Sequence, residues 1–398
     1  MWWMYVLAIL RVHFTVLTID LPLSMMALFS CSFRVPAYEP EKRFIPDDEK
    51  WGKLKFFIIT IVLIYIAWQI FYVMWRALSI PVFEWDVIWR IGLKARIFFF
   101  DHTIEHLKDL PYPGYALGGP FILCWSSLQT GRWCEEALRS IPAFEYLMFI
   151  VFFFGSLNAF VSRFWAILGV GLLVSSGFFT YHATLLYSDL SVSILFCSSI
   201  FCLLLWDKSN DNRLLPISSL LLGAAGLFKL ESFIFAFLVI LTWGPVFISK
   251  KCGLRALMSF LVPVTLILIC HETLIGNLHV SADGIKIGLL GLTGMTGRML
   301  MTLIALAQQF FVSWNWNVLG GLLSALLIAH LKSIWEHEVN RRLFIFFCLW
   351  IIYLFMASVL TDKFRVLAGP DSYQTLPRMI LQFYPLCPAL IVLILAKV

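Results

Sequence analysis

Lys229 and Glu231 interrupt an otherwise apolar stretch that runs from Leu214 to Ser249. The stretch has roughly 36 residues, whereas a bilayer core needs about 20 helical residues. We therefore expect the chain to cross a membrane, turn at residues 228–232 and cross back. A charge at the bilayer centre costs on the order of 3 kcal/mol, but at a turn between two crossings it reaches the interface at little cost. Two opposite charges at a membrane rim form a candidate site.

The composition of the whole chain also indicates a membrane protein. It has 398 residues, of which 61% are hydrophobic and 14% charged, and a mean hydropathy of +0.87. These values exclude an ordinary soluble domain and are typical of a helical protein with many crossings. The nine cysteines include no CxxC pair, which argues against a disulfide scaffold or a zinc cluster. A net charge of +6 gives no indication of nucleic-acid binding.

Apolar runs between short polar loops predict about ten membrane crossings. We place them at 56–75, 142–161, 165–182, 190–206, 214–228, 232–249, 257–275, 317–332, 343–360 and 378–397. Residues 3–31 either cross or lie in the interface, and residues 299–314 are expected to form an interfacial helix because the apolar run is short. The prediction is an all-α polytopic membrane protein with about 10–12 transmembrane helices.

No internal repeat stands out, so residues 1–398 are predicted to form a single transmembrane domain. Residues 1–53 form an N-terminal segment with or without one extra crossing, and no cleaved signal peptide is expected. Residues 76–141 form a first outer loop with interfacial helices. Residues 276–316 form a second outer loop.

Basic residues orient the crossings, because lysine and arginine concentrate in cytoplasmic loops. The clusters are Lys42, Arg43, Lys50, Lys53 and Lys55; Arg163; Lys208 and Arg213; Lys250, Lys251 and Arg255; and Lys332, Arg341 and Arg342. With ten crossings that begin inside, all these clusters are cytoplasmic. The loop 76–141 and the turn with Lys229 then lie together on the opposite face.

The first outer loop carries an acid and two cations at helical spacing. Asp86, Arg90 and Lys94 lie at i, i+4 and i+8 and would share one helix face, with Trp85 and Trp89 beside it. One interpretation is a solvated ion-pair face on an interfacial helix. The other is an acid beside cations at the lipid rim, an arrangement that suits a substrate bearing phosphate.

His102-Thr103-Ile104-Glu105-His106 matches the H-x-x-E-H pattern of inverted zinc proteases. On a helix, His102 and His106 could bind zinc with Glu105 as base. The pattern is short and no third ligand is evident downstream, so a plain polar loop helix is favoured.

Three motifs, in order, resemble the GT-C superfamily of membrane glycosyltransferases, specifically its bacterial branch of protein mannosyltransferases and aminoarabinose transferases. The first is similar to W-D-x-x-x-x-W near K-A-R, followed by a Tyr-Pro segment. The second resembles Y-A-D-x-P, and the third resembles G-x-x-x-x-T-K-x-E-G. They are Trp85-Asp86 with Trp89, Lys94-Ala95-Arg96 and Tyr112-Pro113; Tyr187-Ser188-Asp189-Leu190-Ser191; and residues 222–232 around Lys229 and Glu231.

This resemblance implies transfer of a sugar from a polyprenyl-phosphate-linked donor to an envelope glycan, lipid or protein acceptor. It also implies a bacterial inner membrane protein whose active site faces the periplasm or exterior. The donor phosphate at the membrane rim needs fixed positive charge. We expect Lys229 to supply it first, then Arg378 and Lys94. Asp86 is the expected base for the acceptor hydroxyl, with inversion at the sugar carbon.

The resemblance leaves several roles open. Asp189 either orients the acceptor or holds a divalent cation together with Asp86; otherwise it is a favourable charge at a helix N-terminus. Glu231 either contacts the sugar or pairs with Lys229 to pin the turn, and Tyr112 is expected to line the lipid or sugar groove. No cofactor beyond that cation is expected.

The alternative function is a polytopic transporter or flippase for a lipid-linked or anionic substrate. Transporters place charges near the membrane midplane and often have two similar halves. Here the charges gather on one face and no repeat is visible, which favours the transferase.

Overall fold

The computed structural model describes residues 1–32, 52–249, 253–278, 292–316, 318–361, 367–369 and 372–396. Several basic residues that orient the crossings lie outside these ranges, namely Lys42, Arg43, Lys50, Lys250 and Lys251. Parts of the segments 1–53 and 276–316 also lie outside them.

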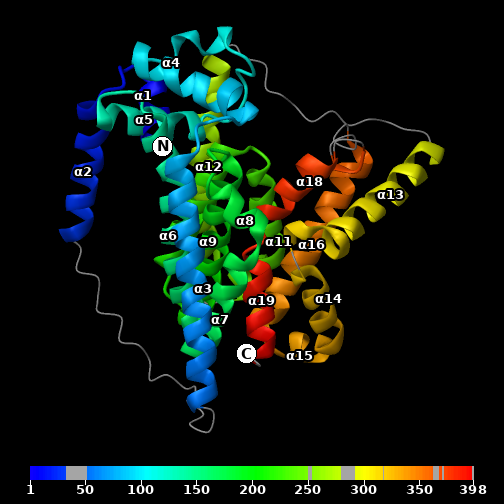
Figure 1. Cartoon of the computed structure of the whole chain (residues 1–398). Coiled ribbons are helices and arrows are strands. Elements are labelled where there is room, and N and C mark those ends of the chain that lie inside the picture. Colours follow the sequence, from blue (N-terminus) through cyan, green and yellow to red (C-terminus); the bar gives the residue numbers. More distant parts are fainter. Residues whose placement is uncertain are drawn as a thin grey trace.

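The described chain is a helical bundle, which confirms the all-α polytopic class (Figure 1). Six described helices are long and apolar enough to cross a membrane, or seven if one bent pair counts as a span. The six are α3 (Gly52–Ser79), α6 (Glu135–Asn158), α9 (Ser188–Ser209), α12 (Gly253–Asn277), Met295–Val312 and α16 (Glu338–Leu360). The bent pair is α18 (Ser372–Leu381) with α19 (Leu386–Leu395). Shorter apolar helices include α7 (Arg163–Ser175), α10 (Leu214–Phe228), α11 (Ser232–Ser249) and α14 (Leu319–Ala329).

One segment is longer than expected, and another, whose placement the sequence left open, forms two helices. Met295–Val312 comprises α13 (Leu292–Ala307) and a π-helical turn, and it has the length and composition of a crossing rather than of a short interfacial helix. Residues 3–31 form two helices, α1 (Trp2–Ile9) and α2 (Val16–Ser32). Arg11 lies between them with a φ of 55°, a left-handed conformation that stops α1 after two turns.

Helix α9 lies at the centre of the bundle, and most of its side chains are buried. Small polar residues let α10 approach it closely, as is common where helices pack in membranes. The hydroxyls of Ser199 and Ser218 lie 2.8 Å apart across this contact. On the other side of α10, Gly223 is packed so closely that a Cβ would come within 2.5 Å of Ile267 in α12.

The long apolar stretch from Leu214 to Ser249 is interrupted at Lys229 and Glu231, as the sequence predicts. Helix α10 ends at Phe228, Lys229 has an extended backbone, and α11 begins at Ser232. Phe233 packs its ring on Gly226, where a Cβ would lie within 2.5 Å of the ring. The two helices therefore meet closely at the break, and Lys229 projects from it.

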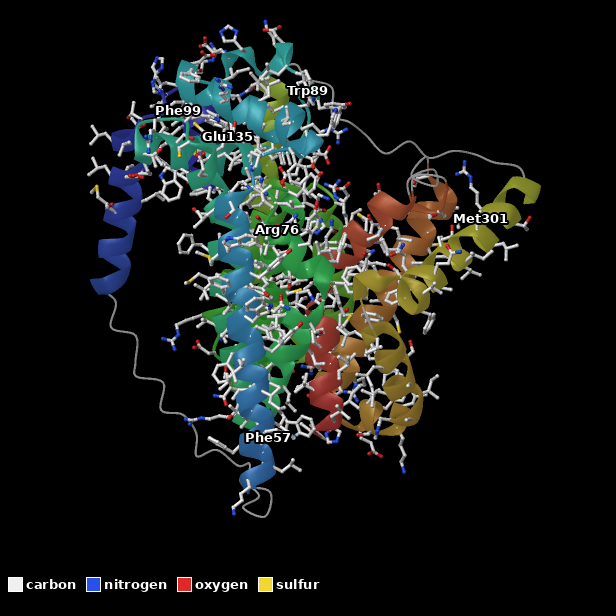
Figure 2. All side chains as sticks on the ribbon, viewed as in Figure 1. Phe57, Arg76, Trp89, Phe99, Glu135 and Met301 are labelled. Atoms are coloured by element: carbon white, nitrogen blue, oxygen red, sulfur yellow. The ribbon has the colours of Figure 1, made fainter. Side chains whose placement is uncertain are left out.

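The first loop covers one end of the bundle with the π-helix Val87–Gly92, α4 (Leu93–Asp101), the 3₁₀ helix Glu105–Asp109 and α5 (Gly118–Thr130). Figure 2 places Trp89, Phe99 and Glu135 at this end, away from Phe57. Described basic turns meet at the other end, where Lys208 donates to the carbonyl of Ala159 and Arg342 pairs with Asp207. These basic turns and the first loop therefore lie at opposite ends of the bundle (Figure 1).

Candidate functional site

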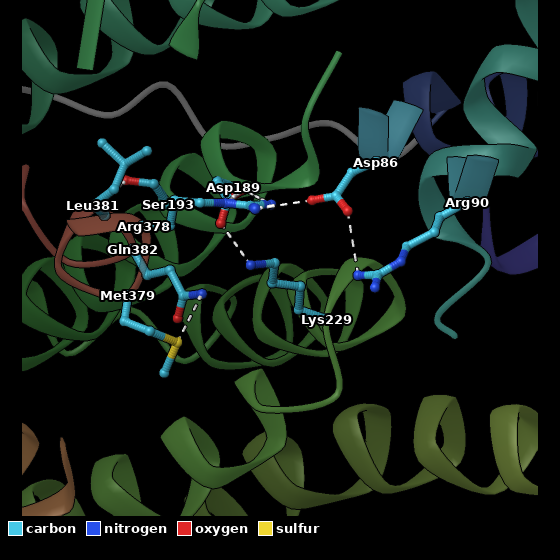
Figure 3. A network of polar contacts seen from close by, with 9 residues as sticks. All are labelled: Asp86, Arg90, Asp189, Ser193, Lys229, Arg378, Met379, Leu381 and Gln382. Carbon is cyan, nitrogen blue, oxygen red and sulfur yellow. Dashed lines mark hydrogen bonds and ion pairs between the residues drawn. The ribbon is translucent and has the colours of Figure 1, made fainter. Parts of the chain in front are cut away.

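Four charged side chains from distant parts of the sequence converge at the covered end of the bundle (Figure 3). Asp86 immediately precedes the π-helix of the first loop, and Asp189 lies in the first turn of α9. Lys229 follows α10, and Arg378 lies in the last turn of α18. The expected meeting of the first-loop aspartate and the turn lysine on one face is therefore seen in the structure.

Arg378 joins the two acids. Its Nε and Nη2 atoms both lie 2.8 Å from Oδ2 of Asp189, and its Nη1 donates to Oδ2 of Asp86 over 2.9 Å. Lys229 donates to the other oxygen of Asp189 over 2.5 Å. Every oxygen of Asp189 thus faces a cation. Charge-assisted contacts of this kind are the strongest hydrogen bonds in proteins.

Burial differs between the two acids, and this difference separates their chemical uses. Asp189 is fully buried, and its charge is compensated by two cations and by the N-terminus of α9. The side chains of Asp86 and Arg378 are 18% and 24% exposed. Asp86 can therefore meet an incoming substrate, whereas Asp189 organises the cations.

Lys229 keeps its charge despite its surroundings. Burial, the largest single effect, lowers the pKa of this amine, but the attractions of Asp189, Tyr115 and Glu231 together outweigh the opposing effects, and the pKa lies above its ordinary value. A protonated amine at this position satisfies the requirement for fixed positive charge.

Arg90 adds a third cation, as the spacing from Asp86 predicts. Its Nη1 lies 3.3 Å from Oδ1 of Asp86, one turn earlier. Its guanidinium lies 4.1 Å from the ring centre of Tyr112 and 5.3 Å from that of Trp85. Tyr112 is itself exposed and has a left-handed backbone between Pro111 and Pro113. It therefore forms part of the rim of the site.

Two other predicted residues lie outside the four-residue charged centre, Lys94 beneath the Tyr-Pro segment and Glu231 beside Lys229. Lys94 is fully buried, and its Nζ donates to the carbonyl of Tyr112 over 2.5 Å, so it holds the Tyr-Pro segment in place. Glu231 is half-buried beside Lys229, and within the described ranges its carboxylate has no recorded hydrogen bond or ion pair.

The H-x-x-E-H segment does not form one helix. His102 ends α4 with a φ of 55°, and Glu105–Asp109 is a separate 3₁₀ turn. His106 faces Asp101 and Asp109 at 4.0 Å instead. The helical spacing that would bring both histidines to a zinc ion is lost. Within the described ranges, no group of three or more His, Cys, Asp or Glu residues is placed to hold a metal ion.

Two tyrosines complete the site. Tyr187 lies directly before α9, and its ring is 4.5 Å from the guanidinium of Arg378. Tyr115 lies within 5.8 Å of the Lys94 amine, and burial raises the pKa of its hydroxyl. The position of Tyr187 two residues before Asp189 was a usable sequence signal, whereas nothing in the sequence singled out Tyr115.

Arg378 reaches the centre because its helix is broken. Helices α18 and α19 are bent by 51° at residues 382–385. Ser193 in α9 donates to the carbonyl of Leu381 over 2.7 Å, which satisfies one of the acceptors left free at the end of α18. The helix that carries Asp189 thereby also fixes the helix that carries Arg378.

Glu84 and Arg139 hold the start of the first loop against the bundle. They form a buried ion pair at 3.4 Å, and Arg139 also donates to the carbonyls of Pro81 and Thr184. Glu84 lies two residues before Asp86, so this ion pair fixes the position from which the Asp86 side chain reaches the site. The sequence offered no signal that Arg139, 55 residues later, would be its partner.

No protein-family model and no curated protein matches the sequence. Two solved structures are similar in fold. One is the crystal structure of an Archaeoglobus fulgidus oligosaccharyltransferase in complex with Zn and sulfate, with a TM-score of 0.53 and 13% identity over 81% of this chain and 48% of that chain. The other is the archaeal oligosaccharyltransferase AglB from Archaeoglobus fulgidus in complex with an inhibitory peptide and a dolichol-phosphate, with a TM-score of 0.50 and 12% identity over 82% of this chain and 50% of that chain.

These similarities define the class of the fold. The described helices share the fold of these two oligosaccharyltransferase structures over about half of each of those chains, and the chain is a multi-pass membrane protein. The chain spans about half the length of the two proteins it resembles. At this identity the comparison shows the fold alone, so the chemistry is argued from the side chains.

Proposed function

We propose that this protein is a glycosyltransferase that moves a sugar from a polyprenyl-phosphate-linked donor to an acceptor on the non-cytoplasmic face of a membrane. The observation that carries the proposal is the continuous chain of ion pairs from Lys229 through Asp189 and Arg378 to Asp86. It lies at one end of a GT-C-type bundle, where a lipid headgroup would lie.

The donor phosphate would bind by replacing carboxylates as the partner of Lys229 and Arg378. Lys229 and Arg378 pair with carboxylates in the described structure. The phosphodiester of the donor offers them one negative charge on two free oxygens, and a second charge develops on this phosphate as the sugar leaves, so both cations would bind the leaving group more tightly than the donor. Arginine suits this exchange because its fork can grip a phosphate with two parallel bonds. The dolichol-phosphate bound to the archaeal oligosaccharyltransferase supports a donor of this class.

The same exchange would activate Asp86. Before the donor binds, each oxygen of the Asp86 carboxylate faces an arginine, Oδ1 facing Arg90 and Oδ2 facing Arg378. Movement of Arg378 onto the phosphate removes one of these partners and frees an oxygen to accept the proton of an acceptor hydroxyl. The hydroxyl oxygen then forms the new bond to the sugar carbon as the phosphate leaves with the bonding electrons. Displacement from the opposite side inverts that carbon.

The remaining residues would serve this centre. Asp189 holds Lys229 and Arg378 at the required spacing before the donor arrives. Glu231, which has no recorded partner within the described ranges, is free to accept hydrogen bonds from the sugar, and Tyr112 lines the approach. A divalent cation would bind Asp86 and Asp189 together only after Arg378 moved from between them.

The finer assignment follows the sequence motifs. The order of the Trp-Asp, Tyr-Ser-Asp and Lys-x-Glu motifs supports the bacterial branch that contains protein mannosyltransferases and aminoarabinose transferases. It also supports a bacterial inner membrane with the site toward the periplasm. An envelope glycan, a lipid or a protein would then be the acceptor.

Asp86→Asn tests the proposal. Loss of a general base lowers the rate about 10²- to 10⁴-fold, so glycan products in the membrane lipid fraction should fall to background by mass spectrometry at normal protein abundance. Asp101→Asn, on the same loop but outside the charged centre, is the matched control and should retain wild-type product. Retained transfer in Asp86→Asn would remove the residue from the reaction.

One observation favours transport as a second candidate. The broken pair α18 and α19 carries a charged residue near its break, a feature of secondary transporters. In liposomes containing a fluorescent polyprenyl-phosphate sugar, a flippase would move lipid between leaflets without any acceptor. A transferase would leave the lipid distribution unchanged and, once an acceptor was added, would produce glycosylated acceptor and free polyprenyl phosphate.

A further inference from the structure

A large apolar groove lies on the flank of the bundle, outside the charged centre. Its cavity volume is about 850 Å³, and side chains from α5, α6, α9 and α10 line it, among them Trp125, Phe144, Met148 and Ile194. Phe144 and Met148 are exposed on α6, which has the length and composition of a crossing. The groove therefore opens sideways, toward lipid. Its volume is within the range of pockets that enclose a whole ligand.

The described side chains that line the groove include one acid and no lysine, arginine or histidine. The Glu145 carboxylate faces it from α6 and accepts a hydrogen bond from the Ser191 hydroxyl over 2.6 Å. The described lining includes no lysine or arginine, and Glu145 forms no ion pair with any described residue. A carboxylate without a cation at membrane depth costs free energy. Ionisable residues at such positions in membrane proteins commonly mark functional sites.

The acid at the outer rim of the groove differs from Glu145 because both of its oxygens are hydrogen-bonded. Asp20 of α2 accepts hydrogen bonds from Trp125 over 2.8 Å and from Gln129 over 2.5 Å, so both of its oxygens are satisfied. Both donors line the groove. This acid fastens α2 to the rim, whereas Glu145 retains an oxygen for a ligand.

The inner end of the groove adjoins the charged centre. A hollow of about 20 Å³ shares Glu145, Ser191 and Phe228 with the groove and continues to Tyr187. The ring of Tyr187 contacts Arg378, and Phe228 directly precedes Lys229. The hollow has room for about one water molecule. A headgroup therefore reaches the charged centre by this route only when the residues around the neck move apart.

We infer that the groove holds the apolar chain of the acceptor, an amphiphile whose hydroxyl or amino groups donate hydrogen bonds to Glu145. The inference rests on the proposed function, since it divides the two substrates between two sites. The donor phosphate has its cations at Lys229 and Arg378, whereas the described groove lining offers an acid at Glu145 and no lysine or arginine to hold a phosphate. A neutral or amino-bearing headgroup matches the groove.

Photolabelling in nanodiscs tests the inference without turnover. The probes are a dodecyl β-glucoside and a farnesyl phosphate, each with a diazirine at the far end of the chain. We expect the glucoside to label α6 and α9 around the groove, and Glu145→Leu to lower this labelling several-fold. Stronger labelling of these helices by farnesyl phosphate would overturn the inference, because the groove would then take the donor chain.

Two substitutions on one helix provide the matched comparison. Met148 lines the groove and is 61% exposed, whereas Val151 lies outside the lining and is 62% exposed. Met148→Trp should block the groove and lower glucoside labelling several-fold, and Val151→Trp should leave it unchanged. Equal labelling in both variants would mean nonspecific contact with lipid and would refute the site. Transfer retained in Asp86→Asn would instead refute the proposed chemistry, and the labelling result would still stand.

Discussion

Arg378 and Asp189 are 189 residues apart in the sequence, and the Nε atom of one lies 2.8 Å from the carboxylate of the other. The contact joins the first turn of α9 to the last turn of α18. Because Arg378 also reaches Asp86, a single guanidinium connects three separate parts of the chain. The charged centre therefore depends on the shape of this side chain as well as on its charge.

We predict that Arg378→Lys lowers transfer roughly 10²- to 10³-fold, the range seen when one donor that stabilises a reacting charge is removed. Lysine keeps the charge but cannot bridge two carboxylates or grip a phosphate with a fork. Initial rates at saturating acceptor measure the effect. Arg341→Lys, at the other end of the bundle, should keep the wild-type rate, and similar rates in the two variants would contradict the role of Arg378.

The buried pair of Lys229 and Asp189 yields a prediction on stability. Removal of one partner of a buried pair costs about 3–5 kcal/mol, and Lys229→Met should lie near the lower end because Arg378 still faces Asp189. Lys229→Met together with Asp189→Leu should lose less stability than the sum of the single changes, yet show no transfer. Thermal unfolding in nanodiscs measures stability, with the exposed Lys332→Met as control. Strict additivity would show that the pair is uncoupled.

Some parts of this site were predictable and others were not, for physical reasons. The break at Lys229 follows from the length of the apolar stretch, and the pairing of Asp86 with Arg90 follows from helical spacing. The burial of Lys94 was not predictable, because the π-helix and the Tyr-Pro turn that supply its acceptor are tertiary features. For the same reason the sequence could rank Arg378 as a cation but could not show that it bridges both acids.

The state of Lys229 leads to a prediction on pH. The pKa of this amine is raised above its ordinary value of 10.5, so its favourable interaction is fully present below that value and is lost only as the pH rises through the higher folded-state value. Loss of the Lys229 charge should therefore not limit transfer at or below pH 10. Lys229→Arg should show the same alkaline limb as the wild type in a pH–rate profile between pH 6 and pH 10. An earlier loss of activity in the wild type alone would show that the amine deprotonates in this range.

The position of Arg378 leads to a prediction on metal removal. Its guanidinium lies between Asp86 and Asp189, the two acids that would otherwise hold a divalent cation, and it pairs with both. Transfer should therefore continue at the same rate after treatment with EDTA, and added Mg²⁺ or Mn²⁺ should not increase it. Loss of activity with EDTA that Mg²⁺ restores would show that the two acids bind a divalent cation during turnover, once Arg378 has moved to the donor phosphate.

The buried ion pair of Glu84 and Arg139 holds the start of the first loop in place. Its removal should affect the stability of the protein and the rate of transfer to different extents. Arg139→Met leaves the Glu84 carboxylate buried without its cation, which should cost about 3–5 kcal/mol of stability. Because Glu84 lies two residues before Asp86, we also expect a lower kcat in the fraction that stays folded. Arg139→Met with Glu84→Leu removes both charges and should recover most of the stability but not the rate, because the carbonyls of Pro81 and Thr184 still lack their donor. If the stability and the rate recover to the same extent, the pair contributes to folding only.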